Sequence, residues 1–385
     1  MRLRRFDHSQ FLSFASRIME TLRAAVIGRT GRGDYGHGLD EVWTDLPGVQ
    51  LVAVADDNKT GLAATAKKLK VDKAFADYRQ MLDTVKPDVV SIGARWLDAH
   101  RDIVVETAGR GIHIYLEKPL CRDLAEADEM VATCERTHAK LAIAHTTRHS
   151  PRIPVVKEML AANKIGRVLE FRGRGKEDPT RGGGEDLWVL GTHIMDLIRL
   201  LGGDPTWCFG RVLKGGRPIT KAEVVDGNEG IGPLAGDAVN AMYGLGGATT
   251  AYFASHRGTS GKRPRFALQI FGSEGILEIT TGYLPSVKYL ADSSWSPGQS
   301  GAKWETVTSA GLGKPEPLTD GKDHSGNRQG VLELLKAIRE NRQPEGSIYD
   351  ARAAVEMIAA VFESQRLGKP VELPLKNRQN PLTML

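Results

Sequence analysis

Residues 22–57 have the sequence LRAAVIGRTGRGDYGHGLDEVWTDLPGVQLVAVADD, in which two continuous apolar runs enclose a glycine-rich turn. The runs LRAAVI and VQLVAVA each predict a strand that is buried on both faces. Between them, residues 38–48 predict a helix that ends at Pro47 and Gly48. Strand, glycine turn, helix and strand in this order are typical of a parallel α/β unit.

The alternation of short apolar runs with helical stretches continues to about residue 147. The runs DVVSIGA, IHIYL and KLAIAH follow one another with amphipathic segments between them. Because these strands are apolar throughout, we expect a doubly wound parallel sheet that is covered by helices on both faces. Residues 22–147 are therefore predicted to form an α/β domain of the Rossmann type.

Residues 148–385 show a different pattern, in which strands follow one another with few helices between them. The strand-like segments lie at residues 167–174, 206–214, 237–245, 249–256, 265–281 and 286–292. Within FALQIFGSEGILEIT, a Ser-Glu-Gly turn predicts a hairpin. The pattern predicts a second, α+β domain built on a mostly antiparallel sheet. Two helices near the C-terminus can pack back on the first domain.

Residues 1–21 contain several arginines but no apolar core typical of a signal peptide. We expect a loose N-terminal extension there. A short amphipathic anchor or targeting segment is the alternative.

The composition excludes several classes of protein. With 385 residues, 41% hydrophobic and 26% charged, the chain has the make-up of a soluble globular protein. A net charge of +5 is too small to indicate a nucleic-acid partner, and no apolar run approaches the roughly 20 residues of a membrane span. Three cysteines without paired spacing form neither a disulfide framework nor a metal site, which favours a reducing, cytoplasmic location.

The first chemical signal is the turn GRTGRG at residues 28–33, directly after the first predicted strand. Glycines allow the backbone to turn sharply and approach a pyrophosphate, whose charge the N-terminus of the following helix favours. The spacing here is G-x-x-G-x-G, and a purely structural turn is the alternative. The candidate cofactor ligands of this turn are Gly28, Arg29, Thr30, Gly31 and Gly33.

Asp56 ends the second apolar run. A carboxylate at this place can accept hydrogen bonds from ribose hydroxyls and repel a 2′-phosphate, which favours NAD over NADP. Arg29 and Arg32 keep NADP as the alternative, because a guanidinium can pair with the additional phosphate.

Glu117, Lys118 and Pro119 follow the run IHIYL, at the carboxyl end of a predicted strand. Ligands of open α/β sheets bind beyond these strand ends, so this tripeptide is expected to face the ligand crevice. A lysine there can hydrogen-bond a substrate hydroxyl, and partial burial lowers its pKa. The alternative is a surface lysine, with Pro119 only ending the strand pairing.

His193 lies within a predicted helix whose apolar stripe ends at Gly202 and Gly203. The histidine lies beside the centre of this stripe, with Asp196 three residues later. A structural histidine is one interpretation. The ten histidines of the chain form no dense group of ligands, so we expect no metal site.

The order of these motifs resembles that of the glucose–fructose oxidoreductase / inositol dehydrogenase family, usually called Gfo/Idh/MocA. The resemblance covers residues 22–373 and is carried by the glycine turn, LVAVAD, DYRQML, Glu117-Lys118-Pro119 and the helix around His193. It implies a nicotinamide-dependent oxidoreductase that acts on a secondary hydroxyl of a sugar, cyclitol or related polyol. It also implies a homodimer or homotetramer that associates through the antiparallel sheet.

The resemblance further implies roles for individual residues. Lys118 matches the family lysine that contacts substrate and nicotinamide ribose, beside Glu117, and His193 matches the usual proton acceptor. Lys118 and His193 are therefore the expected catalytic residues and also substrate ligands. The bond between Lys118 and Pro119 is expected to be cis. Arg148 is expected on the substrate side of the crevice.

Two positions depart from the family pattern. The residue four places before His193 is Val189 where the family usually has aspartate. Asp186 is then either a displaced carboxylate that contacts the substrate or an N-cap of the helix. The strand before the lysine strand usually ends in Thr-Pro, and here a Gly-Ala-Arg tripeptide stands in its place. Its residues are further candidate cofactor contacts: Gly93, Ala94 and Arg95.

Three functions are compatible with these features. The first is an NAD(P)-dependent sugar or polyol dehydrogenase. The second is a glycoside hydrolase or lyase of the same fold that retains NAD and oxidises its substrate transiently, an alternative that Val189 leaves open. The third is a non-catalytic sensor of dinucleotide or sugar.

Overall fold

The N-terminal part of the chain forms a parallel, doubly wound sheet, as predicted. Below, the two parts predicted as domains, residues 22–147 and 148–385, are called the first and the second half of the molecule. The computed structural model describes residues 21–262, 265–321 and 323–385, so the predicted extension lies outside the described residues except for Thr21. Six strands pair in the order β3-β2-β1-β4-β5-β6, all parallel. They are β1 (Leu22–Ile27), β2 (Val49–Ala55), β3 (Ala74–Phe75), β4 (Val89–Ile92), β5 (His113–Leu116) and β6 (Leu141–Ile143).

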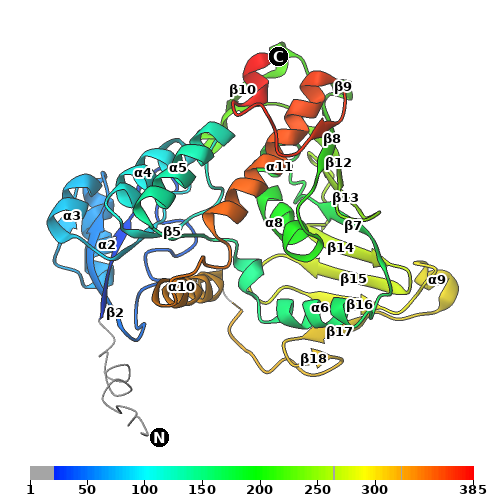
Figure 1. Ribbon diagram of the computed structural model, residues 1–385, viewed down its shortest axis with the longest axis horizontal. Helices are drawn as coiled ribbons and strands as arrows, with labels where there is room; N and C mark the ends of the chain where they lie inside the picture. The colour runs from blue at the N-terminus through cyan, green and yellow to red at the C-terminus, as the bar shows by residue number, and fades with distance from the viewer. Residues whose placement is uncertain (1–20, 263–264, 322) are drawn as a thin grey trace, which may run out of the picture.

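Helices cover this sheet on both faces (Figure 1). Their bounds are α2 (Lys59–Leu69), α3 (Tyr78–Val85), α4 (His100–Gly109) and α5 (Leu124–Thr137). Asn58, Asp77 and Asp123 begin α2, α3 and α5, each accepting a hydrogen bond from a backbone amide of the first turn. Because the strands are parallel, their carboxyl ends lie at one edge of the sheet. The residues predicted to bind the cofactor follow these strand ends.

The helix predicted for residues 38–48 is wrong, because this segment is a series of turns. Gly36, Gly38 and Asp45 have φ angles of 60°, 81° and 55°, which place them in the left-handed region and interrupt any right-handed helix. The apolar side chains between them, including Leu39 and Trp43, are nevertheless buried. The apolar spacing therefore indicated the burial correctly and the backbone conformation incorrectly.

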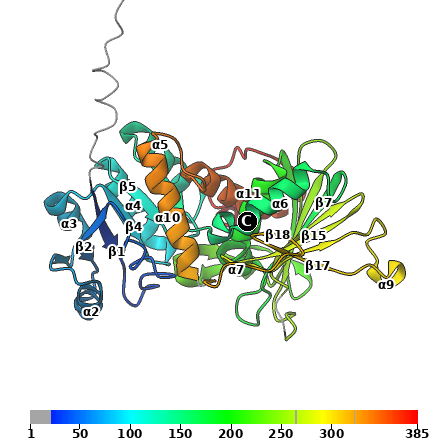
Figure 2. The same cartoon turned by 90° about the horizontal axis from the view of Figure 1, so that it is seen from below.

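Helix α10 (Asp323–Arg339), from the C-terminal part of the chain, packs on the face of the first sheet beside these turns. Its side chains Val331 and Leu334 share an apolar cluster with Val26 of β1, Tyr115 of β5 and Trp43. Figure 2 shows α10 lying across the strands of this sheet. A helix distant in sequence thus covers this face of the sheet together with the turns of residues 38–48.

The second sheet is mostly antiparallel, as predicted. Eleven strands take part in it, in the order β18-β17-β16-β15-β14-β7-β13-β12-β8-β19, with β9 on β8. Only the pairing of β7 with β13 is parallel within the described residues. The predicted hairpin is confirmed, because β14 and β15 are joined at Ser273 and Glu274. The longer strands are β7 (Val168–Arg174), β8 (Trp207–Lys214), β12 (Ala238–Gly244), β13 (Thr250–His256), β14 (Ala267–Gly272), β15 (Gly275–Thr280) and β16 (Val287–Leu290).

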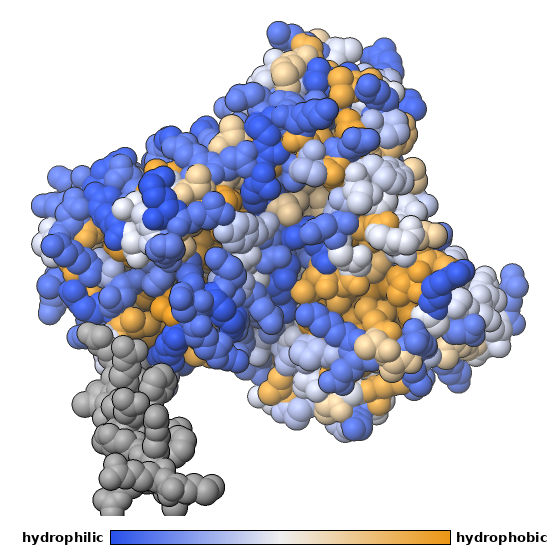
Figure 3. Space-filling view, viewed as in Figure 1, coloured by the Kyte–Doolittle hydropathy of each residue, from blue (hydrophilic) through white to orange (hydrophobic). Residues whose placement is uncertain are grey.

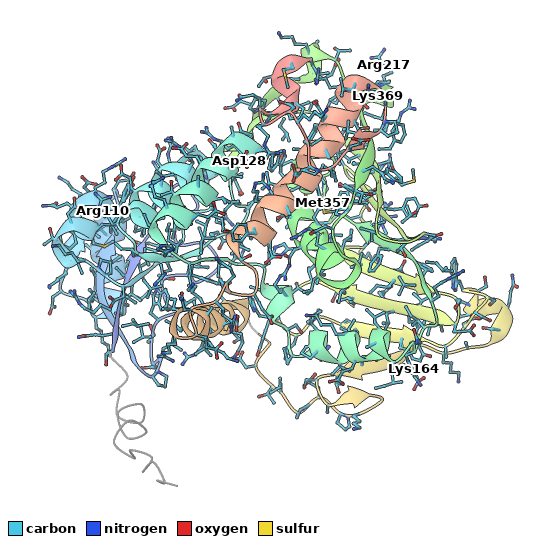
Figure 4. All side chains as sticks on the ribbon, viewed as in Figure 1. Arg110, Asp128, Lys164, Arg217, Met357 and Lys369 are labelled. Atoms are coloured by element: carbon cyan, nitrogen blue, oxygen red, sulfur yellow. The ribbon has the colours of Figure 1, made fainter. Side chains whose placement is uncertain are left out.

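Helices cover one face of this sheet and connect it to the first half (Figure 1). They are α6 (Arg152–Ala161), α7 (Gly184–Val189), α8 (Gly191–Gly202) and α11 (Ile348–Leu367). On α5, Asp128 accepts hydrogen bonds from Arg352 of α11 and from Arg378 of the C-terminal segment. Figure 4 shows Asp128 on the side of α5 nearest to α11. These ion pairs bind the two halves into one body.

The two halves differ in surface character. Hydrophilic residues cover most of the visible face of the first half, whereas apolar residues are exposed over part of the second (Figure 3). The outward positions of β8 and β13 include the exposed side chains of Phe209 and Tyr252. Among the described residues, no helix combines the length and apolar character that crossing a bilayer requires.

Candidate active site

A cavity of about 350 Å³ lies at the carboxyl ends of β1, β2 and β3. Its lining includes Gly28, Arg29, Asp56, Asp57, Tyr78 and Asp98. This is the edge at which doubly wound sheets bind nucleotides. Five carboxylates line the cavity against two guanidinium groups, which is an unfavourable surrounding for a further phosphate. They are Asp56, Asp57, Asp77, Asp98 and Asp102, against Arg29 and Arg79.

Asp56 lies in this cavity wall, but most of its hydrogen-bonding capacity is used by the protein itself. Its carboxylate accepts hydrogen bonds from the backbone amide of Thr30 at 3.1 Å and from the Thr30 hydroxyl at 2.6 Å. The amide of Asn58 donates a third bond at 2.9 Å. The predicted ribose contact of Asp56 stays a prediction. What the geometry shows is a carboxylate that fastens the glycine turn to the end of β2.

The neighbouring Asp57 was not singled out from the sequence, although it stands directly after Asp56. Its side chain is 58% exposed, and it accepts a hydrogen bond from Nε of Arg29 at 3.2 Å. Asp98 lies 3.7 Å from the same guanidinium. Arg29 is therefore held between two carboxylates at the mouth of the cavity, where it is not free to bind a phosphate.

We expect Asp57→Ser to raise the affinity for NADP relative to NAD by about tenfold, because Nε of Arg29 loses its carboxylate partner and can form one charge-assisted hydrogen bond with a 2′-phosphate. Dissociation constants of both dinucleotides, measured by fluorescence titration, check this. Asp72→Ser removes an equal charge from an exposed position outside the cavity and is the control. An unchanged NAD/NADP ratio in Asp57→Ser would show that Arg29 is not the group that discriminates.

The glycine turn approaches the protein itself more closely than the sequence suggested. A Cβ at Gly28 would lie 2.2 Å from the ring of Tyr35, and one at Gly33 would lie 2.6 Å from Cβ of Arg95. A Cβ at Gly36 would lie 2.4 Å from the Glu117 carboxylate. Gly31, with a φ of 85°, has nothing within 4 Å of such a Cβ. Much of the glycine requirement therefore comes from internal packing, and Gly31 is the open position of the turn.

Residues 31–36 also match the spacing G-x-G-x-x-G, three residues further from the strand than usual. The extra residues form a short loop in which the Arg29 and Asp34 backbones are hydrogen-bonded to each other. This loop explains why the spacing counted from Gly28 is irregular.

The Gly-Ala-Arg tripeptide after β4 lies against the glycine turn. The amide of Gly93 donates to the carbonyl of Ile27, and the buried Ala94 carbonyl lies 2.6 Å from Nε2 of His100. Arg95 packs on Gly33 and lies 3.5 Å from Glu229. A second-half residue therefore reaches over the crevice.

Glu229 lies on the hairpin of β10 (Val225–Gly227) and β11 (Gly232–Leu234). It also accepts a hydrogen bond from Arg181 at 2.8 Å. No periodicity in this glycine-rich stretch could have indicated the contact.

Lys118 lies at the carboxyl end of β5, and its peptide bond to Pro119 is cis, as expected. The side chain is buried, and its Nζ donates a hydrogen bond to the carbonyl of Val189 at 3.1 Å. Burial lowers the pKa of Lys118 from its usual value, although the carboxylates of Glu117 and Glu229 act in the opposite direction. The surface-lysine alternative is therefore wrong.

The Val189 carbonyl is available to Lys118 because a helix ends there. Helix α7 ends at Val189 and α8 begins at Gly191, and the amide of His193 bonds to the carbonyl of Leu190. A carbonyl at the last residue of a helix lacks its intrahelical partner. The family position that usually carries a carboxylate thus contributes a backbone oxygen in this chain.

His193 and Lys118 share a second cavity, of about 160 Å³. Also in its lining are His37, Glu117, Thr146, Gly282 and Asn327. The Nδ1 atom of His193 is buried and has no hydrogen-bond partner among the described residues. Burial lowers the pKa of His193 well below its usual value, and Lys118 adds to this effect. The imidazole is therefore neutral at physiological pH and able to accept a proton.

A second imidazole, that of His145, packs against the ring of His193. His145, buried at the end of β6, lies with its ring centre 5.4 Å from that of His193 in an edge-on arrangement. Its Nε2 lies 3.0 Å from the Thr192 hydroxyl, and its Nδ1 lies 3.3 Å from Asp196. Asp196 therefore fixes His145, which in turn limits the orientations open to His193.

Arg148 is not brought into this cavity. Its guanidinium bonds to both oxygens of Asp196, at 3.1 Å and 2.5 Å, and is buried with it. Burial alone would raise the pKa of Asp196, but Arg148 and His145 outweigh it and hold that pKa well below its usual range. The position of Arg148 therefore gives no support to its predicted substrate contact, because its guanidinium is bound to the Asp196 carboxylate.

Breaking this pair is expected to destabilise the fold. Arg148→Met leaves the Asp196 carboxylate buried without its cation, which should cost about 3–5 kcal/mol of unfolding free energy in urea titrations. Arg110→Met, which removes a surface arginine at the far end of the first half (Figure 4), is the control and should leave the midpoint almost unchanged.

The same pair predicts a pH dependence. Since the folded pKa of Asp196 is depressed, its stabilising contribution is complete above about pH 4 and is lost as the pH falls further. Arg148→Met should weaken that loss between about pH 4 and pH 2. An unfolding midpoint equal to that of the unchanged protein would contradict the structural role assigned to Arg148.

Asp186 is also not among the residues that line this cavity. Its buried carboxylate accepts hydrogen bonds from the Ser255 hydroxyl at 2.5 Å and from the Glu177 amide at 3.1 Å. The N-cap of α7 is Gly183, so the predicted cap role of Asp186 is wrong. Burial raises the pKa of Asp186. Its predicted substrate contact gains no support, because both of its bonds join α7 to β13 and the preceding loop.

Comparison with known proteins matches two family models to the chain. Residues 22–145 match the model of an oxidoreductase family with an NAD-binding Rossmann fold, and residues 157–373 match the C-terminal α/β domain of that family. Together they cover most of the sequence.

Among the described residues, no group of three or more His, Cys, Asp or Glu side chains could hold a metal ion.

Individual relatives are distant in sequence, and the share of the chain that they match differs widely. D-apiose dehydrogenase of Paraburkholderia graminis is 24% identical over 97% of this chain and 96% of its own. A 2,7-anhydro-N-acetylneuraminate hydratase of Mediterraneibacter gnavus is 25% identical over 39% of this chain and 38% of its own. A structure of levoglucosan dehydrogenase with NADH and levoglucosan superimposes with a TM-score of 0.74 at 21% identity, covering 92% of this chain and 100% of that one. At that identity the superposition establishes the fold.

Proposed function

The chain belongs to the Gfo/Idh/MocA family of oxidoreductases, and from this we propose that it is an NAD-dependent dehydrogenase of a carbohydrate. The reaction transfers a hydride between a secondary hydroxyl of a sugar, cyclitol or polyol and the nicotinamide. The observation that carries the proposal is that Lys118 and His193, from different halves, line one cavity beside the nucleotide edge of the sheet.

The residues at this edge fit NAD. The 350 Å³ cavity, the open Gly31 and the excess of carboxylates around Asp57 suit an adenosine without a 2′-phosphate. We assign the glycine turn and the loop at Gly93 to holding the cofactor, with Lys118 beside its reactive end. When bound, the cofactor supplies the hydride acceptor of the reaction.

The two side chains divide the acid–base chemistry. Lys118, already oriented by the Val189 carbonyl, donates a hydrogen bond to the substrate hydroxyl oxygen and stabilises the charge that develops there. The neutral His193 accepts the hydroxyl proton while the carbinol hydrogen leaves as hydride. Lys118 and the Nδ1 atom of His193 are buried, and this strengthens the interactions that they make.

Screening a panel that contains D-apiose, levoglucosan and myo-inositol for absorbance of NADH tests the proposal. A rise with at least one sugar, sugar acid or cyclitol is expected, and it should be larger with NAD than with NADP. Tight NAD binding with no turnover of any panel member would instead favour a sensor of dinucleotide or sugar.

One observation favours a second candidate function. Val189 removes the carboxylate that would ordinarily stand beside His193, and a relative in the family carries the name of a hydratase. A hydrolase or lyase that retains NAD and oxidises its glycoside transiently uses the same hydride acceptor without net reduction. Product analysis of the panel reactions distinguishes the two, because this candidate cleaves or hydrates its substrate without accumulating NADH.

The setting of the enzyme can be proposed from two further features. The three cysteines are free and buried, which agrees with a reducing compartment such as the cytoplasm.

The exposed Phe209 and Tyr252 lie on the uncovered side of the second sheet, and we propose that a homodimer or homotetramer forms there. Sedimentation of Tyr252→Lys, expected to be of lower mass, tests the interface.

A further inference from the structure

His37 lines the cavity of about 160 Å³ that Lys118 and His193 share. Among the described titratable side chains of this cavity, it is the one to which no role has been assigned. It follows Gly36 and precedes Gly38, both of which have positive φ. Its carbonyl accepts a hydrogen bond from Nδ2 of Asn327 at 3.0 Å, and Oδ1 of Asn327 in turn accepts one from the Tyr115 hydroxyl at 3.0 Å. Helix α10 and strand β5 together fix the backbone of His37 at the cavity.

Glu117 fixes the imidazole ring of His37. Nδ1 of His37 lies 3.1 Å from Oε1 of Glu117, and the His37 amide donates to Oε2 at 3.2 Å. Burial alone would raise the pKa of Glu117, but His37 and Lys118 outweigh it and lower it, so the carboxylate is ionised. An ionised carboxylate only accepts, hence Nδ1 of His37 is the donor. The other ring nitrogen, Nε2, is left as the atom that can take up and release a proton.

His37 connects the cavity to solvent. Its side chain is 39% exposed, whereas that of Glu117 is 1% exposed. Lys118 is also buried, and the Nδ1 atom of His193 is inaccessible. Within the described residues that line this cavity, His37 is therefore the most exposed of the titratable side chains.

Oxidation of an alcohol requires such a connection. The O–H bond of the carbinol breaks and its proton passes to His193, the C–H bond breaks and its electron pair leaves as hydride to NAD, and a C=O bond forms. Each turnover thus leaves one proton on His193, whose Nδ1 atom is buried, and that proton has to reach solvent before the next cycle.

We propose that His37, oriented by Glu117, carries this proton from the cavity to solvent. The inference rests on the proposed dehydrogenase function. His37 acts on the proton after it has left the substrate, so that Lys118 and His193 remain the groups that contact the reacting alcohol.

The test replaces His37 by glutamine, whose amide can still donate to Glu117 but cannot carry a proton. With NAD and whichever of D-apiose, levoglucosan or myo-inositol the unchanged enzyme oxidises fastest, His37→Gln should lower kcat by about 10²-fold. The dissociation constant of NAD should stay within about twofold. Added imidazole should restore much of kcat in His37→Gln and leave the unchanged enzyme unaffected.

His138→Asn is the matched control, because His138 ends α5 away from the cavity in the left-handed conformation that asparagine tolerates. It should keep full activity and show no response to imidazole. If His37→Gln is insoluble, His37→Asn carries the same expectation. The proposal is overturned if the variant turns over at the normal rate, or if imidazole does not rescue the loss. Failure of the unchanged enzyme to reduce NAD with any panel member would instead refute the proposed function.

Discussion

Lys118→Met is expected to lower kcat/KM for carbohydrate oxidation by about 10³-fold, because the hydroxyl oxygen loses its buried hydrogen-bond donor in the transition state. Methionine preserves most of the volume of the lysine side chain but cannot donate to the substrate or to the Val189 carbonyl. The effect should fall mainly on kcat, since the donor matters most when negative charge develops on oxygen. Initial rates of NADH formation at saturating NAD measure it.

The control for Lys118→Met is Lys140→Met. Lys140 is another buried lysine, placed just before β6 and therefore at the opposite edge of the same sheet. It should retain normal kinetics, although its thermal stability can fall. If Lys118→Met loses no more activity than Lys140→Met while both remain folded, Lys118 is not the donor.

His193→Asn is expected to lower kcat by about 10²–10⁴-fold, the usual contribution of a positioned general base. Asparagine retains a polar group in the pocket and the helix can continue through it, so NAD binding should change little. Because burial and Lys118 depress the pKa of His193, the base remains neutral when the pH falls through the ordinary histidine value of about 6.5. In the unchanged enzyme, kcat should therefore decline only at lower pH.

The pH profile separates a base from a structural histidine. In His193→Asn the acidic decline of kcat attributable to the imidazole should disappear, leaving a low rate that is nearly independent of pH in this range. His256→Asn, on the second sheet and hydrogen-bonded to Asn240, provides a histidine replacement outside the cavity. A normal pH profile at reduced rate in His193→Asn would show that another group accepts the proton.

Much of the architecture could be predicted because local patterns and tertiary contacts agree there. Continuous apolar runs such as LRAAVI indicated the parallel sheet, and the alternating burial of strands such as β8 and β13 belongs to a sheet with one covered face. The segment 38–48 failed for a physical reason. Its apolar period suited a helix, but left-handed residues at both ends made turns of it.

The candidate site was predictable where a residue's place depends on its own strand or helix. Lys118 and His193 follow from the end of β5 and the start of α8, and both line the same cavity. The surroundings of Arg148 and Asp186 could not be predicted, because their partners, Asp196 and Ser255, lie 48 and 69 residues away. A buried charged group is stabilised by a counter-charge, as in Arg148, or by hydrogen-bond donors, as in Asp186, and no local pattern shows where these partners are.

The contacts of Asp57, Glu229 and His37 belong to a third group, in which the chemistry was visible and the geometry was not. His37 stands beside the glycine turn in the sequence, yet its pairing with Glu117 spans 80 residues. Glu229 crosses from one half of the molecule to the other, to Arg95. The contact of Glu229 arises from the docking of the two halves, whereas those of Asp57 and His37 join separate strand ends of the first sheet. Short motifs encode neither kind of contact.

The central claim is that one cavity oxidises a carbohydrate hydroxyl with net transfer of hydride to NAD. The most direct measurement counts NADH formed and carbohydrate consumed in the same reaction, by absorbance and chromatography. Our account predicts one NADH for each molecule of ketone product. Consumption of substrate with no accumulation of NADH would contradict it and would establish transient oxidation instead.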